Sequence, residues 1–166
     1  MELDNTDRRR MLERIQAQEE LLQFETFTFA DGWQLGLTIR EQVLAHGGDA
    51  AVDVTVGGVQ LFRCAVGNPA PNNSRWIRRK QNTVLEQGKS SLRVAQEMAL
   101  SGRTLEEFGL TASEFALSGG GFPIRVRGMG VIGVATVSGL PQTHDHQMVV
   151  NAMAAALHRD VPDVRE

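Results

Sequence analysis

Four cations stand within six residues in the segment Arg75–Lys80, at the start of a stretch whose apolar spacing predicts a helix. Positive side chains are unfavourable there, because the helix dipole already places partial positive charge at the N-terminal end. We therefore expect a compensating partner. The free N–H groups of the first turn, with Arg78, Arg79 and Lys80, could together hold a phosphate or a carboxylate. Acidic groups of this chain, a second subunit or solvent are the alternatives.

Thr83 extends this polar group along the same predicted helix. It follows Lys80 by three residues and Arg79 by four, so these side chains can share one helix face. A polar stripe beside an apolar face is also what any surface helix shows. Thr83 is thus a candidate ligand contact, with an ordinary solvated face as the alternative.

A triple glycine, Gly119, Gly120 and Gly121, could let backbone N–H groups approach a ligand closely. The pattern differs from both common phosphate-binding motifs. It is not Gly-x-Gly-x-x-Gly between a strand and a helix, and no Gly-Lys-Ser/Thr follows it. Nucleotide binding of these two kinds is not expected, and a tight turn leading into a strand is the alternative to a ligand cradle.

Other residues that can do chemistry do not combine into a catalytic set. His144 and His146 are two apart at the start of a predicted helix, so their side chains face different directions and a shared metal is not expected. Cys64 is the single cysteine, which excludes an internal disulfide, and its place in an alternating run predicts a buried position. With no Gly-x-Ser-x-Gly motif either, no catalytic residue is assigned and an enzyme is not the favoured interpretation.

Helices and two hairpins must position these residues. Glycines between apolar runs predict a hairpin at 51–66 and a second hairpin within 118–141. Hairpins require antiparallel pairing, so we expect an α+β fold with one mostly antiparallel sheet of four or five strands. Helices are expected at about 3–22, 31–46, from 74 with a kink or break at Gly88, and from 143 to 157, with a short strand at 24–29.

Length and composition predict one domain over residues 1–166, with an N-terminal helix at 1–22 and a loose tail at 159–166. No apolar run is long enough for a membrane span, and the acidic N-terminus is unlike a secretory signal, so we expect a cytoplasmic protein with no membrane partner. A net charge of −3 argues against a nucleic-acid partner, because such proteins normally carry a basic face.

Three segments carry a resemblance to a known family. They are Gly119–Arg125, Gly130–Gly139 and, more specifically, Trp76–Val84, with Asp145 in the last predicted helix. On these motifs the chain resembles the GlcG/HbpS-like family, also called the haem-degrading domain. Within it the chain is similar to an uncharacterised subfamily with a Trp-Ile-Arg-Arg-Lys-x-Asn-Thr-Val stretch, and the match runs from about Leu12 to Leu157.

The resemblance implies a profilin-like, three-layer α/β/α fold and assembly into homo-oligomers. Some relatives bind haem, so haem is one candidate ligand, although this chain has no tyrosine and no Cys-Pro or Cys-His haem motif. The resemblance places a ligand region on the following residues: Lys80, Thr83, Gly119, Gly120, Gly121, Phe122, Ser138 and Gly139.

These observations favour a cytoplasmic, oligomeric domain that binds an anionic small molecule between the basic helix and the glycine-rich hairpin. In this hypothesis Arg78, Arg79 and Lys80 supply charge, while Gly120 and Gly121 supply backbone donors. The second hypothesis is a structural or interaction protein in which the same segments form subunit interfaces. A haem-degrading enzyme is the third.

Overall fold

The computed structural model describes residues 3–165, so the first two residues and the last residue of the predicted domain lie outside the described residues. Within that range the chain forms five α-helices, a single turn of 3₁₀ helix and four strands. In chain order they are α1 (Asn5–Leu21), α2 (Phe29–His46), β1 (Ala50–Val56), β2 (Val59–Val66), α3 (Asn73–Gln87), α4 (Ser91–Ser101), η1 (Glu106–Phe108), β3 (Gly121–Val126), β4 (Gly130–Ser138) and α5 (Gln142–Leu157).

The four strands form one antiparallel sheet in the order β2-β1-β4-β3. Both predicted hairpins are present, with Gly57 and Gly58 at positive φ between β1 and β2. The two hairpins join along β1 and β4, where Asp53 lies opposite Thr136. The α+β class and the antiparallel sheet expected from the sequence are confirmed.

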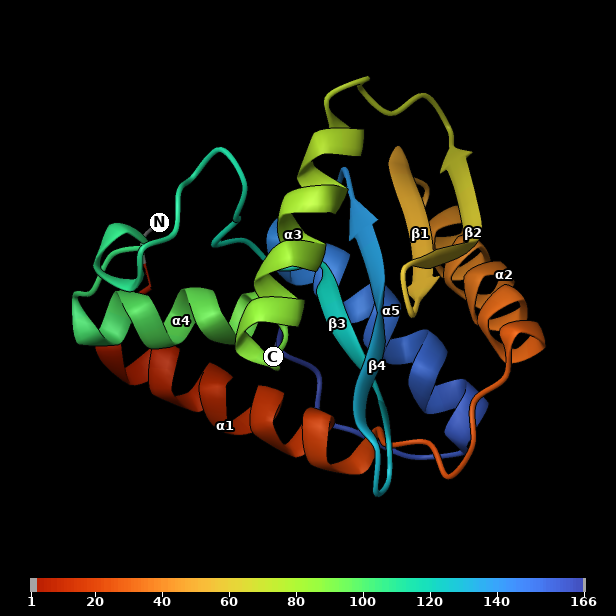
Figure 1. Ribbon diagram of the computed structural model, residues 1–166, viewed down its shortest axis with the longest axis horizontal. Helices are drawn as coiled ribbons and strands as arrows, with labels where there is room; N and C mark the ends of the chain where they lie inside the picture. Colours follow the sequence, from red (N-terminus) through yellow and green to blue (C-terminus); the bar gives the residue numbers. More distant parts are fainter. Residues whose placement is uncertain (1–2, 166) are drawn as a thin grey trace.

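Helices cover both faces of the sheet (Figure 1). The helix α3 lies on one face, α2 and α5 lie on the other, and α4 packs beside the edge strand β3 with α1 along it. This is the three-layer α/β/α arrangement that the resemblance implied. It places the basic start of α3 and the first turn of α5 on opposite faces of the same strands.

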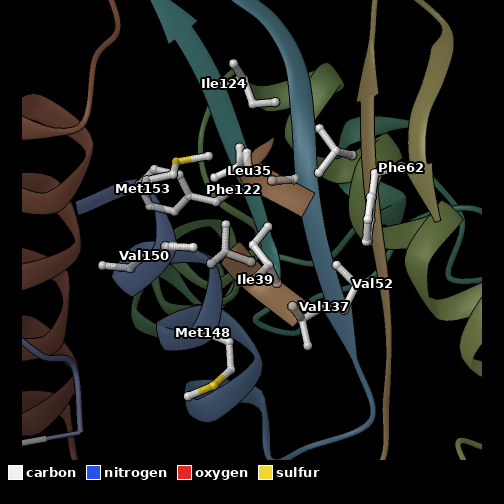
Figure 2. Packing of buried hydrophobic residues seen from close by; sticks show 14 of the residues in the cluster. Leu35, Ile39, Val52, Phe62, Phe122, Ile124, Val137, Met148, Val150 and Met153 are labelled. Atoms are coloured by element: carbon white, nitrogen blue, oxygen red, sulfur yellow. The ribbon is translucent and has the colours of Figure 1, made fainter. Parts of the chain in front are cut away.

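The main hydrophobic core fills the space between the sheet and the pair α2 and α5 (Figure 2). Alternate residues of each strand point into it, including Val52 and Val54 from β1 and Phe122 and Ile124 from β3. Each such side chain, fully buried, contributes about 1.5–3 kcal/mol. The opposite set of strand positions faces α3, and there the sheet also carries polar side chains such as Asp53 and Thr136.

The segment before α2 differs from its prediction. Phe24 makes only an isolated parallel bridge to Val126 in place of a strand over 24–29. Thr28 caps α2, because its side chain accepts from the Asp31 amide while the Asp31 carboxylate accepts from the Thr28 amide. This reciprocal capping box starts the helix earlier than a cap at Asp31 would.

Gly88 resolves the alternative that the sequence left open for the basic helix. It lies in the left-handed region at φ 65° and ends α3, so two helices form there.

The C-terminal tail also differs from the loose segment expected at 159–166. Val164 is 4% exposed, and its amide donates to Gln147 Oε1 at 3.2 Å. Gln18 of α1 donates to the carbonyl of Pro162 at 2.7 Å. Two helices therefore hold the tail through its backbone, which composition alone does not indicate. Among residues 3–165 no helix is long and apolar enough to cross a membrane.

Candidate functional site

The sequence-predicted site centres on Lys80, which α3 directs into the interior of the protein. Its side chain is 3% exposed. The ammonium donates to Asp145 Oδ2 at 2.9 Å and to the carbonyl of Val137 at 3.0 Å. Lys80 thus links α3 to α5 past the end of strand β4.

Asp145 is equally buried and holds the loop between β4 and α5. Its carboxylate accepts from the amide of Leu140 at 2.9 Å and from the amide of Gly139 at 3.3 Å, in addition to Lys80. Burial lowers the pKa of Lys80 and raises the pKa of Asp145, while the opposite charge acts against both shifts. The four hydrogen bonds of the pair offset part of the cost of removing two charges from water.

The triple glycine packs against this ion pair. Gly120 lies at φ 131°, and a Cβ placed there would lie 2.3 Å from the carbonyl oxygen of Val137 and 2.7 Å from the Lys80 nitrogen. The amides on either side have acceptors within the chain, because Gly121 donates to Ser91 Oγ and Gly119 donates to Gln142 Oε1. In this structure the glycines provide close packing, and two of their three amides are engaged.

Three further predicted residues contact other parts of the chain and do not bind the pair of Lys80 and Asp145. Thr83 accepts from the amide of Ala116 and donates to its carbonyl, fixing the loop before β3. Ser138 donates to Asn73 at the start of α3. Phe122 points into the core on the α5 side of the sheet, so it lies on the opposite face from Thr83.

Arg78 and Arg79, in contrast to Lys80, lie toward the surface of α3. The Arg79 guanidinium stacks 4.3 Å from the centre of the Trp76 ring and donates to the carbonyl of Phe115. Arg78 is exposed, as is Arg75, and neither has an acidic partner within residues 3–165. We call these residues, Arg75, Trp76, Arg78 and Arg79, the cationic surface.

The structure therefore divides the predicted site into two parts. Lys80, Gly120 and Gly139 meet at Asp145 in the interior, and Arg78 and Arg79 lie outside it on the cationic surface. Sequence reasoning left Arg75 out of the site and gave Asp145 no role beyond a family motif. Arg75 could have been found from the same argument about cations at a helix start. The pairing of Asp145 with Lys80 could not, because 64 residues separate the two in the chain.

Among residues 3–165, the histidine and cysteine side chains that could support acid–base or metal chemistry form no hydrogen bond with the pair of Lys80 and Asp145. His146 is fully buried, and burial lowers its pKa to about 3, so its imidazole stays neutral. Burial raises the pKa of the Cys64 thiol. Within the described part of the chain, no three His, Cys, Asp or Glu side chains are grouped as metal ligands would be.

Sequence comparisons point to a single family. The family model described as haem degrading protein HbpS-like matches residues 27–154. A UPF0303 protein of Rhizobium etli is 41% identical over 154 residues, which is 93% of this chain and 94% of that protein. A UPF0303 protein of Burkholderia mallei is 45% identical over 147 residues, covering 88% and 89% of the two chains.

Solved structures show the same fold. The crystal structure of Ybr137w protein superimposes with a TM-score of 0.81 at 33% identity, covering 89% of this chain and 87% of that one. HbpS gives a TM-score of 0.64 at 21% identity over 81% and 92% of the chains. A complex of PduOC with heme gives 0.66 at 18% identity over 83% and 98%.

Proposed function

The chain belongs to the HbpS-like family, and we propose that it is a cytoplasmic, oligomeric protein that binds a small anionic ligand, with haem as the first candidate. We assign it to the uncharacterised subfamily whose motif it carries at Trp76–Val84. One observation carries the proposal of an anionic ligand. Arg75 and Arg78 stand at the start of α3 without an acidic partner within residues 3–165.

A cation in the first turn of a helix, where Arg75 lies, is unfavourable by about 0.3–1 kcal/mol, since it opposes the helix dipole. The first turn of α3 has no acidic residue and no side-chain cap to offset it. An external anion would supply the missing charge. The indole of Trp76, which already stacks with Arg79, adds a flat aromatic surface beside the cations. A planar molecule with carboxylate groups fits this combination, and the haem complex of PduOC makes haem the first compound to test.

In this proposal Arg75, Arg78 and Arg79 contact the ligand. Direct ligand contacts by the other predicted residues stay predictions, since in the structure these residues contact other segments of the same chain: Lys80, Thr83, Gly119, Gly120, Gly121, Phe122, Ser138 and Gly139. Lys80 would serve the ligand indirectly, because its bond to Asp145 fixes the position of α3.

A subunit interface is the second candidate function of the cationic surface. The chain carries a net charge of −3, so a second copy has acidic groups with which Arg75 and Arg78 could pair. A haem-degrading enzyme has less support, because no acid, base and nucleophile lie together in the described residues.

Titration with hemin, followed by the Soret band, tests the ligand proposal. We expect a Soret shift with the wild-type protein and about tenfold weaker binding by Arg75→Gln/Arg78→Gln, because two charge-assisted contacts are lost. Arg9→Gln/Arg159→Gln removes two exposed charges elsewhere and should bind as the wild type does. The absence of a Soret shift with hemin, together with no thermal shift across a panel of anions, would refute the proposal.

Light scattering distinguishes a subunit interface from a ligand site at the cationic surface. If Arg75→Glu/Arg78→Glu dissociates an oligomer and hemin has no effect on the wild type, the cationic surface is an interface. If the oligomer persists and hemin binding falls, it is a ligand site.

A further inference from the structure

A cavity of about 520 Å³ lies where α1 and the segment before it, together with the C-terminal tail, meet the start of α5. This volume is within the range of small-molecule sites in proteins. We call it the terminal cavity. The residues that line it are Leu3, Asp7, Arg10, Met11, Arg14, Pro141, Gln142, Thr143, His144, Val164 and Arg165.

The wall of the terminal cavity is basic. Arg10, Arg14 and Arg165 line it together with one carboxylate, Asp7, and Arg165 is already paired with the carboxylate of Asp163. The ion pair between Arg10 and Asp7 is 3.8 Å long and both side chains are at least half exposed, so it neutralises Arg10 weakly. Arg14 donates one guanidinium nitrogen to the carbonyl of Asp163, an uncharged acceptor that leaves its charge uncompensated. A bound anion would therefore meet an excess of positive charge.

Other polar groups at the cavity also favour an anion. Nδ1 of His144 is buried and has no hydrogen-bond partner in the described part of the chain. Beside it α5 has Pro141 at its N-cap position and no side-chain cap, so the positive end of the helix dipole borders the cavity. His144 and the helix start thus add to a site that Arg10 and Arg14 already define.

Apolar surface forms the remainder of the wall. Met11 and Val164 belong to one buried hydrophobic cluster, and Leu3 is exposed at the rim. Inorganic phosphate or sulfate would fill a small part of the volume and leave this surface in water. A ligand with a charged head and an apolar body would use both kinds of wall, since burying apolar surface is favourable.

The terminal cavity is built mainly from segments beyond the family match. Seven of its eleven lining residues lie outside residues 27–154, in α1, just before it at Leu3, and in the C-terminal tail. None of the residues of the cationic surface takes part in it. It is therefore a separate candidate site from the one proposed above.

We infer that the terminal cavity binds a small amphipathic carboxylate, such as a medium-chain fatty acid. The carboxylate pairs with Arg10 and Arg14, whose guanidinium groups match its geometry. The alkyl chain lies along Met11 and Val164. This site is independent of the proposed haem-binding function.

Calorimetric titration with octanoate tests the inference. We expect octanoate to bind the wild-type protein more tightly than acetate or inorganic phosphate, and octylamine not to bind. Arg10→Gln/Arg14→Gln should weaken octanoate binding by about tenfold or more, because charge-assisted contacts are lost. Arg9→Gln, an exposed neighbour on the same helix that does not line the cavity, should leave the affinity unchanged.

Because Arg14 also holds the tail, Arg10→Gln alone provides the check that the fold is intact. It should weaken octanoate binding while leaving the unfolding midpoint near that of the wild type. In NMR spectra of the wild type, octanoate should shift the ring resonances of His144. Absence of octanoate binding, equal affinity in the double variant, or tighter binding of phosphate than octanoate would overturn the inference.

Titrations of both double variants with hemin and with octanoate test whether the two proposed sites are distinct. Arg10→Gln/Arg14→Gln should bind hemin as the wild type does, and Arg75→Gln/Arg78→Gln should bind octanoate as the wild type does. Loss of both ligands in either variant would show one shared site and would overturn the separate terminal site.

Discussion

The ammonium of Lys80 lies 2.9 Å from Oδ2 of Asp145, and each side chain is 3% exposed. The pair connects α3 on one face of the sheet to α5 on the other, at the end of β4 where the loop Gly139–Leu140 also bonds to Asp145. The positive charge of Lys80 compensates the buried negative charge of Asp145, and the reverse holds as well. Asp145 is therefore the compensating partner for one of the four cations in Arg75–Lys80.

Lys80→Met should destabilise the protein by about 3–5 kcal/mol, because it leaves the Asp145 carboxylate buried without a counter-ion. Lys80→Met/Asp145→Asn should be more stable than the single variant, since Asn still offers an oxygen to the amide of Leu140 and carries no charge. Urea unfolding measures both. A double variant less stable than Lys80→Met would contradict this account of the pair.

Gly120 should tolerate no side chain. Gly120→Ala is expected to destabilise by several kcal/mol, because its Cβ would lie 2.3 Å from the Val137 oxygen and φ is 131°. Gly102→Ala is the matched control, because Gly102 also has positive φ but open space around its Cβ, and it should cost about 1 kcal/mol. Equal thermal midpoints for the two variants would show that packing around Gly120 is unimportant.

The sequence predicts the elements of this fold well because each has a local cause. The valine runs around Gly57 and Gly58 predict a hairpin, and Gly88 predicts an interruption of the basic helix. The capping box at Thr28 is local as well. The sequence predicts a helix from 31, because the Asp31 carboxylate also suits a cap, whereas the start at Phe29 depends on which side chain accepts from which amide.

The candidate site is less predictable, because burial decides which of four adjacent cations turns inward. Lys80 and Arg78 differ by two positions and therefore by about 200° around the helix axis, so they point in nearly opposite directions. The buried partner Asp145 lies on the side that Lys80 faces. The docking of the C-terminal tail is equally hard to predict from the sequence. Its anchors, Gln18 and Gln147, come from two helices far apart in sequence, so nothing near Val164 indicates that it packs.

His146 should make stability depend on pH. Its pKa in the folded protein is lowered from 6.5 to about 3, because the imidazole is fully buried. The unfolded chain therefore binds the proton first as pH falls, so the stabilisation is present above pH 6.5 and is lost as pH falls toward 3. Between about pH 7 and about pH 5 the free energy of unfolding should fall by about 2 kcal/mol from this group.

Urea unfolding at the two pH values, with His146→Gln beside the wild type, measures the contribution of His146. The glutamine amide can still donate to Gln18, so the variant should fold and lose less stability on acidification. His46→Gln, an exposed histidine, is the control and should retain the wild-type pH dependence. The same dependence in His146→Gln as in the wild type would assign it to other groups.

Docking of the tail should contribute both to the free energy of unfolding and to ligand binding in the terminal cavity. Deletion of residues 160–166 removes the buried Val164 side chain and leaves Gln18 and Gln147 without backbone partners, so it should lower the free energy of unfolding by about 2–3 kcal/mol.

Val164→Ala should lower the free energy of unfolding by about 1–3 kcal/mol, and Val161→Ala, at a half-buried position outside the cavity, should lower it less. Because Val164 also lines the terminal cavity, Val164→Ala should weaken octanoate binding, whereas Val161→Ala should not. If the deletion leaves the unfolding midpoint unchanged, the tail is loose, as composition predicts, and it does not form a wall of the proposed site.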